Sequence, residues 1–152
     1  LCELTERVNK KALPLVHIVD MKNEIVEYLK SLGHEVVNYG TDDNASCNYP
    51  EYGEKVGRAV VNGDADCGIL ICGTGVGISI AANKVNGVRA AVCSDCATAR
   101  LVKEHNNANI IAFKGTTRFK KAKKMIDSYI EAKFLNQEPH LKRIALIKEK
   151  EK

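Results

Sequence analysis

Apolar runs of strand length alternate along the chain with segments whose apolar residues recur at helical spacing. That alternation is typical of βαβ units and of a parallel sheet. Strands are expected at 12–19, 34–38, 67–72, 88–93 and 109–113. Helices are expected at 21–31, 50–62, 78–84, 95–105, 118–134 and 141–152. The pattern therefore predicts an α/β protein, a three-layer αβα sandwich around a five-stranded, parallel, Rossmann-like sheet.

Local signals mark the ends of several of these helices. Asp20 is expected to cap the first helix and Gly33 to end it, while Asp95 or Ser94 is expected to cap the fourth. Pro50 suits the first turn of the second helix. In open parallel sheets, ligands bind beyond the carboxyl ends of the strands. Candidate site residues are therefore sought directly after each expected strand.

Three glycines on alternate positions, Gly73, Gly75 and Gly77, follow the buried strand 67–72. They let the backbone curl tightly and expose several N–H groups toward one point, and the helix that follows adds its positive end. Such a turn binds a phosphate or an oxyanion formed during a reaction. It is neither a Walker A loop nor the dinucleotide fingerprint, because the residues that follow the glycines differ. A tight turn that binds nothing is the alternative.

Cys72 stands directly before this turn. A thiol beside several N–H groups and a helix N-terminus is stabilised as the thiolate, so we expect it to act as a base or a nucleophile. A buried structural cysteine is the alternative. Cys93 and Cys96 have the spacing of a zinc knuckle, but Cys67 and Cys72 are five positions apart on one strand and should point to opposite faces. We therefore expect no metal site.

Composition excludes several classes of protein. With 45% hydrophobic and 28% charged residues, the 152-residue chain is neither disordered nor a coiled coil. Its apolar runs are shorter than the roughly 20 residues that span a bilayer. The net charge of +4 suits an anionic ligand but is too small to indicate nucleic acid, and the absence of Trp leaves no stacking platform for single strands. Six cysteines in a Lys- and Glu-rich chain without a secretory segment indicate reduced thiols in the cytoplasm. We expect one domain over 1–152, with no membrane or nucleic-acid partner.

The stretch GILICGTGVGISIAANK at 68–84 resembles the signature of the type B ribose-5-phosphate isomerases. The wider family includes the subunits of galactose-6-phosphate isomerase. Segments 48–52, 87–93 and 104–109 resemble further parts of the family, so the match extends over most of the chain. The sequence of residues 79–83 and the pair His105-Asn106 resemble the pentose enzymes more than the galactose-6-phosphate isomerase subunits.

The resemblance implies an aldose–ketose isomerase of the pentose phosphate pathway without metal or cofactor. It would interconvert D-ribose 5-phosphate and D-ribulose 5-phosphate by proton transfer through a cis-enediolate. Cys72 would take and return the proton, Thr74 would position the open sugar and His105 would open the ring. The other residues expected to bind substrate are Gly73, Gly75, Val76, Gly77, Ser79, Asn83, Asn106, Tyr49, His140 and Arg143.

Elementary chemistry agrees with these roles. A sugar C–H is a very poor acid, so the enolate needs stabilisation where its charge develops, which preorganised N–H groups provide. Histidine is the side chain best suited to exchange protons near neutral pH.

The resemblance also implies a homodimer or a dimer of dimers, because in the family the C-terminal segment reaches the neighbour's site and contributes phosphate ligands. We therefore expect the helix at about 140–152 to pack on a partner subunit.

The chain departs from the family at three places. The family's Asp-His pair after the first strand is replaced by Leu15 and Val16, or one deletion aligns His17 with its histidine. The family's arginine after the fifth strand is replaced by Thr116, and an arginine of its C-terminal segment by Pro139. Losing guanidinium contacts weakens phosphate binding.

The basic run 118–124 is expected to be a solvated helix face, not a phosphate site.

Because of the departures from the family, three alternative functions stay open. The chain is a catalytically impaired or non-catalytic paralogue that binds sugar phosphates, an isomerase for allose or galactose 6-phosphate, or a flavodoxin-like module that binds nucleotides.

Overall fold

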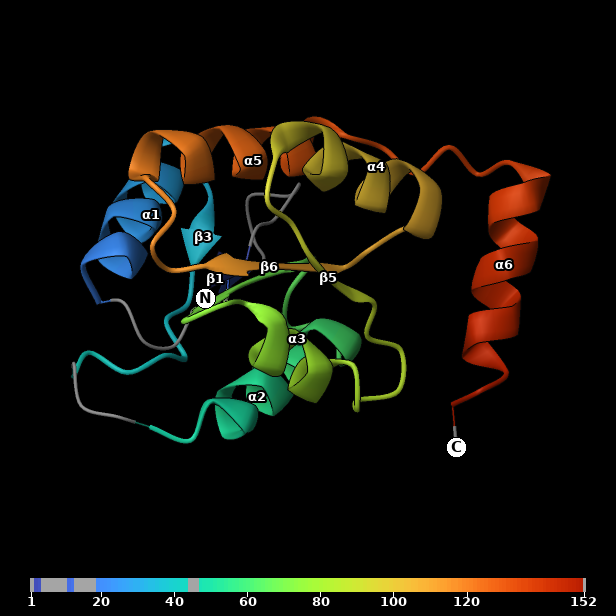
Figure 1. The fold of residues 1–152 in the computed structure, drawn as a ribbon, viewed down its shortest axis with the longest axis horizontal. Helices are drawn as coiled ribbons and strands as arrows, with labels where there is room; N and C mark the ends of the chain where they lie inside the picture. Colours follow the sequence, from blue (N-terminus) through green and yellow to red (C-terminus); the bar gives the residue numbers. More distant parts are fainter. Residues whose placement is uncertain (1, 4–10, 13–18, 44–46, 152) are drawn as a thin grey trace.

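A computed structural model describes residues 2–3, 11–12, 19–43 and 47–151 (Figure 1). Its main sheet has the strand order β1-β4-β6-β5. Strands β4 (Gly68–Cys72), β6 (Ile110–Lys114) and β5 (Ala90–Val92) are parallel, whereas β1 (Cys2–Glu3) pairs antiparallel with β4. A second, two-stranded sheet pairs β2 (Lys11–Ala12) in parallel with β3 (Glu35–Val36).

The α/β fold with a parallel sheet is therefore confirmed, but five parallel strands in one sheet are not confirmed in the described part of the chain. The expected strands 67–72, 88–93 and 109–113 are confirmed as the parallel strands β4, β5 and β6, but β1 is an antiparallel edge strand and β3 belongs to the separate sheet. The expected first strand falls largely on 13–18, outside the described residues. Val19, its expected last residue, instead begins a helix, so Asp20 lies in the first helical turn rather than at the cap. An acidic side chain there is still favourable for the helix dipole.

Helices cover both faces of the main sheet (Figure 1). One face carries α1 (Val19–Ser31), α4 (Cys96–Asn106) and α5 (Phe119–Glu131), and the other carries α2 (Tyr49–Val61) and α3 (Val76–Ala82). The helix α6 (Glu138–Lys148) stands beside the sheet at one end. Every expected helix is present, and most of the observed helix ends lie within three residues of the expected ones.

Strand β4 is buried along its whole length, with Ile69, Leu70 and Ile71 fully inaccessible. Coverage on both faces explains why this strand appears in the sequence as a continuous apolar run. The built Cβ position at Gly68 lies 2.9 Å from Val56 of α2. Because strand residues alternate between faces, Cys72 also points to the side that α2 and α3 cover.

Two helix ends have clear local causes. The Asp95 carboxylate caps α4 by accepting hydrogen bonds from the Thr98 N–H at 2.7 Å and from its hydroxyl at 2.9 Å. These bonds lower the pKa of Asp95. Asn107 ends the same helix in the left-handed conformation, with φ +45°. No described helix combines the length and the apolar character that crossing a bilayer requires.

Candidate active site

The Cys72 thiol lies at the carboxyl end of β4, beneath the glycine turn. Its Sγ accepts a hydrogen bond from the Gly75 N–H at 3.1 Å, and the side chain is 6% exposed. Gly75 has φ +81°, and a Cβ there would approach the Phe113 backbone to 2.9 Å. Only glycine fits this position, because the turn combines a left-handed backbone with a close approach to β6. The donated N–H stabilises negative charge on the sulfur.

The rim of the turn is open. Gly73 and Thr74 are exposed, and nothing lies within 4 Å of a Cβ built at Gly73. The Thr74 hydroxyl accepts a hydrogen bond from the Val76 N–H at 3.2 Å, which fixes the threonine at the start of α3. The thiol, the threonine and the first amides of α3 thus occupy one small region, as the sequence predicted.

Tyr49 and Gly77, both predicted site residues, are in contact. Tyr49 begins α2, is 40% exposed and places its Oη and ring carbons 2.6–2.8 Å from a Cβ built at Gly77. Gly77 itself lies inside α3 and has no left-handed backbone. The space that a side chain at position 77 would fill is therefore occupied by the tyrosine ring, and turn geometry does not call for glycine there.

Ser79 and Asn83 use their polar atoms inside the fold. The buried Ser79 hydroxyl donates to the Val76 carbonyl at 2.7 Å. The Asn83 amide donates to the Ala90 carbonyl and accepts from the Ala90 N–H, both at 2.8 Å. Both residues were expected to bind substrate. In the structure they hold α3 together and attach it to β5.

A second group of predicted residues gathers where α4 ends and α6 begins. The His105 and His140 rings stack, with centroids 4.4 Å apart and an interplanar angle of 12°. Arg89, which the sequence argument missed, donates from its guanidinium to the Asn106 and Asn107 carbonyls at 3.0–3.1 Å. It thereby fixes the end of the helix that carries His105. Arg143, the remaining predicted residue of this group, is exposed on α6.

These two groups lie at opposite edges of the main sheet. Cys72 pairs in register with Lys114, at the carboxyl end of β6. Arg89, which holds the end of α4, donates its N–H to the side chain of Asn109, just before the amino end of β6. The span from Ile110 to Lys114 is roughly 13 Å along the strand. Figure 1 shows β6 running away from the end that α4 and α6 share. The expectation that all candidates follow a strand is therefore wrong for His105.

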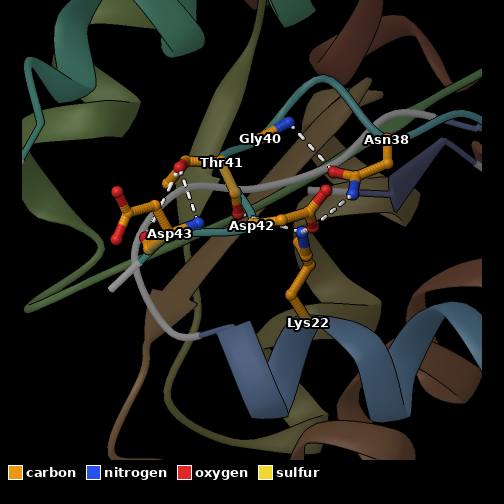
Figure 2. A network of polar contacts seen from close by, with 6 residues as sticks. All are labelled: Lys22, Asn38, Gly40, Thr41, Asp42 and Asp43. Carbon is orange, nitrogen blue, oxygen red and sulfur yellow. Dashed lines mark hydrogen bonds and ion pairs between the residues drawn. The ribbon is translucent and has the colours of Figure 1, made fainter. Parts of the chain in front are cut away.

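A buried lysine organises the loop after β3 (Figure 2). Lys22 on α1 is fully inaccessible, and its ammonium donates to the Thr41 carbonyl at 3.0 Å and pairs with the Asp42 carboxylate. Asn38 donates from its amide to the same carboxylate at 3.1 Å. The hydrogen bond and charge of Lys22 lower the pKa of Asp42. A lysine between the core residues Met21 and Ile25 was the sequence signal for this network.

Cys93, half of the zinc knuckle considered above, has an environment unlike that of Cys72. Burial, with a smaller contribution from the Asp95 carboxylate, raises the pKa of Cys93 to about 12. Its thiol therefore stays protonated at neutral pH. Within the described ranges, no group of three or more His, Cys, Asp or Glu residues could hold a metal ion.

The family departures fall in different places. Leu15, Val16 and His17 lie outside the described residues. Thr116 is exposed in the turn after β6, and Pro139 lies in the first turn of α6. The described structure thus leaves the carboxyl edge of β6 without the arginine that the family resemblance predicts.

Fold and site together define the class: an α/β enzyme whose thiol and glycine turn lie at the carboxyl end of a parallel sheet. Comparisons with known proteins agree. The profile of the Ribose/Galactose Isomerase family matches residues 17–147. The chain belongs to this family and is an aldose–ketose isomerase of the sugar-phosphate type.

Individual relatives have different substrates in their names. The chain is 49% identical over 120 residues to the galactose-6-phosphate isomerase subunit LacB of Clostridium acetobutylicum, covering 78% of this chain and 69% of the relative. It is 45% identical over 115 residues to ribose-5-phosphate isomerase B of Escherichia coli, covering 75% and 77%. The structure of Clostridium thermocellum ribose-5-phosphate isomerase B superimposes with a TM-score of 0.86 at 43% identity, over 91% of this chain and 95% of that one.

Proposed function

We propose that this protein interconverts D-ribose 5-phosphate and D-ribulose 5-phosphate in the cytoplasm. The hydrogen bond from the Gly75 N–H to the Cys72 sulfur is the observation that supports this proposal most directly. As a thiolate, Cys72 removes the proton from C2 of the open aldose, and the C2–H electron pair forms the enediolate double bond. The resulting thiol then returns the proton to C1, while the proton of the C2 hydroxyl passes to O1 and C2 becomes the ketone carbon. Amides at the start of α3 stabilise the enediolate oxygen meanwhile.

The second half of the site comes from another copy of the chain. His105 and Cys72 lie at opposite edges of one sheet, too far apart to act on the same small sugar. A homodimer places His105, Asn106, His140 and Arg143 of the partner subunit beside each Cys72. An isologous, two-fold interface then builds two equal sites. The exposed apolar side chains of α6, Leu141, Leu146 and Ile147, suit a helix that packs on a partner.

The choice of a pentose substrate is supported by the sequence of residues 79–83 and by the His105-Asn106 pair, which resemble the pentose enzymes. Galactose 6-phosphate is the second candidate, because a LacB subunit shares 49% identity with this chain. The two substrates differ by one carbon and therefore in the distance between reacting carbons and phosphate. Direct comparison of turnover decides between them.

The test is a coupled assay for ketose formation from ribose, allose and galactose phosphates. We expect turnover of ribose 5-phosphate, and a loss of roughly 100- to 10,000-fold in Cys72→Ala, because a positioned acid–base group contributes that much. The melting temperature should be unchanged. Cys93→Ala is the matched control and should keep its activity, since that thiol stays protonated.

Three results would contradict the proposal. Full activity of Cys72→Ala would remove the assigned base. An inactive wild type that binds sugar phosphates would identify a non-catalytic paralogue. Stabilisation by ATP or NAD alone would point to the nucleotide-binding alternative.

A further inference from the structure

Lys114 lies beside the Cys72 thiol and has no part in the proton transfer proposed above. It is the last residue of β6 and pairs in register with Cys72. The side chain of Ile110 lies 3.2 Å from a Cβ built at Gly68, so these paired residues project to the same face. Alternation along both strands carries Lys114 and Cys72 to that same face too. Neighbouring strands are about 4.8 Å apart, so the lysine leaves the sheet next to the thiol.

The ammonium of Lys114 is free to bind a ligand. The preceding residues, Ile110 to Phe113, are fully inaccessible, whereas Lys114 is exposed. Within the described part of the chain, its ammonium has no hydrogen bond or ion pair, and it does not bond the Cys72 sulfur. An unpaired cation therefore stands at the open rim of the glycine turn.

Other cations near this edge are placed differently. Arg118, Lys120, Lys121 and Lys124 line a hollow of about 280 Å³. Lys120, Lys121 and Lys124 belong to α5, which covers the opposite face of the sheet, and Arg118 is the N-cap residue of that helix. They raise the positive potential at this edge, but the three lysines stand on a helix that covers the face opposite the thiol, whereas Lys114 projects on the thiol's face.

We propose that Lys114 binds the phosphate group of the substrate at the Cys72 site, an inference that rests on the function proposed above. Thr116 stands in the turn after β6 at the position where the family resemblance predicts an arginine, and Lys114 supplies a cation at the end of β6, directly before that turn. Lysine acts as a point charge on a flexible four-carbon stem, so it can reach an anion beside the thiol without contacting the sulfur. A phosphate monoester presents the largest negative charge of the substrate.

The experiment compares Lys114→Met and Lys114→Arg with Lys120→Met, which removes an exposed cation of α5. Titration calorimetry measures the binding of inorganic phosphate and of ribose 5-phosphate, and the coupled assay gives KM and kcat. We expect Lys114→Met to weaken both affinities roughly 10- to 100-fold, because a charge-assisted hydrogen bond is lost. KM should rise, kcat should stay within about twofold, Lys114→Arg should restore most of the binding, and Lys120→Met should change little.

Calorimetry separates failure of this proposal from failure of the isomerase assignment, because it needs no turnover. A wild type without isomerase activity whose phosphate affinity depends on Lys114 would still support the phosphate site. Unchanged phosphate affinity in Lys114→Met overturns it, as does a wild type that binds no phosphate. A fall in kcat alone would assign Lys114 to the enediolate instead. An equal loss in Lys120→Met would reduce the effect to the general positive field.

Discussion

The ring of Tyr49 lies in the space that a side chain at position 77 would occupy. Its Oη is 2.6 Å from a Cβ built at Gly77, and two ring carbons are 2.7 and 2.8 Å away. This contact joins the first residue of α2 to the first turn of α3, beside the glycine turn and the Cys72 thiol. One glycine therefore determines where the tyrosine ring stands at the rim of the site.

Gly77→Ala is expected to displace this ring while leaving the fold intact. Tyr49 is 40% exposed and can rotate outward at low cost. We expect a several-fold rise in KM with little change in the free energy of unfolding. Gly53→Ala is the contrasting variant, because its Cβ would meet the Ile78 carbonyl, a backbone atom, at 2.8 Å. That variant should lose about 1–3 kcal/mol of stability through overpacking. Urea denaturation and steady-state kinetics measure both, and an unchanged KM in Gly77→Ala would exclude Tyr49 from the substrate contact.

Mixing two inactive variants tests the proposed shared site. Cys72→Ala and His105→Ala homodimers are each expected to be inactive at both sites. After subunit exchange, half of the dimers are mixed, and each mixed dimer regains one intact site of two. Activity should therefore return to about one quarter of the wild-type value. If each active site took Cys72 and His105 from the same subunit, no mixture of the two variants would recover activity.

Asn83→Ala should act on stability rather than on substrate. The variant removes the two 2.8 Å hydrogen bonds that attach the end of α3 to Ala90. At the usual net value for each bond, the free energy of unfolding should fall by about 1–3 kcal/mol. Urea denaturation measures the loss, and Asn23→Ala on the exposed side of α1 is the control. A raised KM without loss of stability would return Asn83 to the substrate site.

The pair of Lys22 and Asp42 predicts a specific response to acid. Lys22 lowers the pKa of Asp42 in the folded state, so the carboxylate stabilises the fold above its unfolded pKa of about 3.9. That contribution disappears as the pH falls through the lowered folded value. Asp42→Asn should therefore be less stable than wild type at neutral pH, and the difference should vanish in strong acid. Denaturant unfolding at several pH values measures it, and a difference independent of pH would show that the charge is not the cause.

Local sequence was sufficient to predict the parallel strands β4, β5 and β6 and the turn that follows Cys72. The apolar run before Cys72 and the glycines after it indicate a buried strand and a tight turn, because both properties depend on nearby residues. Of the two predicted caps of α4, Asp95 and Ser94, the structure shows Asp95, for the same reason. Backbone preference and local hydrogen bonds act over only a few positions, so the residue pattern contains them directly.

Only the tertiary structure decided which distant side chains meet. It placed His105 against His140 and away from Cys72, Tyr49 over Gly77, and the Lys22 ammonium on the loop that carries Asp42. Each of these relationships depends on strand order, on the face of a strand or on how two helices pack. Such features are set by contacts between residues far apart in the chain, which periodicity does not record. The sequence by itself therefore determined the chemical groups available for catalysis, and the packing of the sheet determined how they are divided between its two edges.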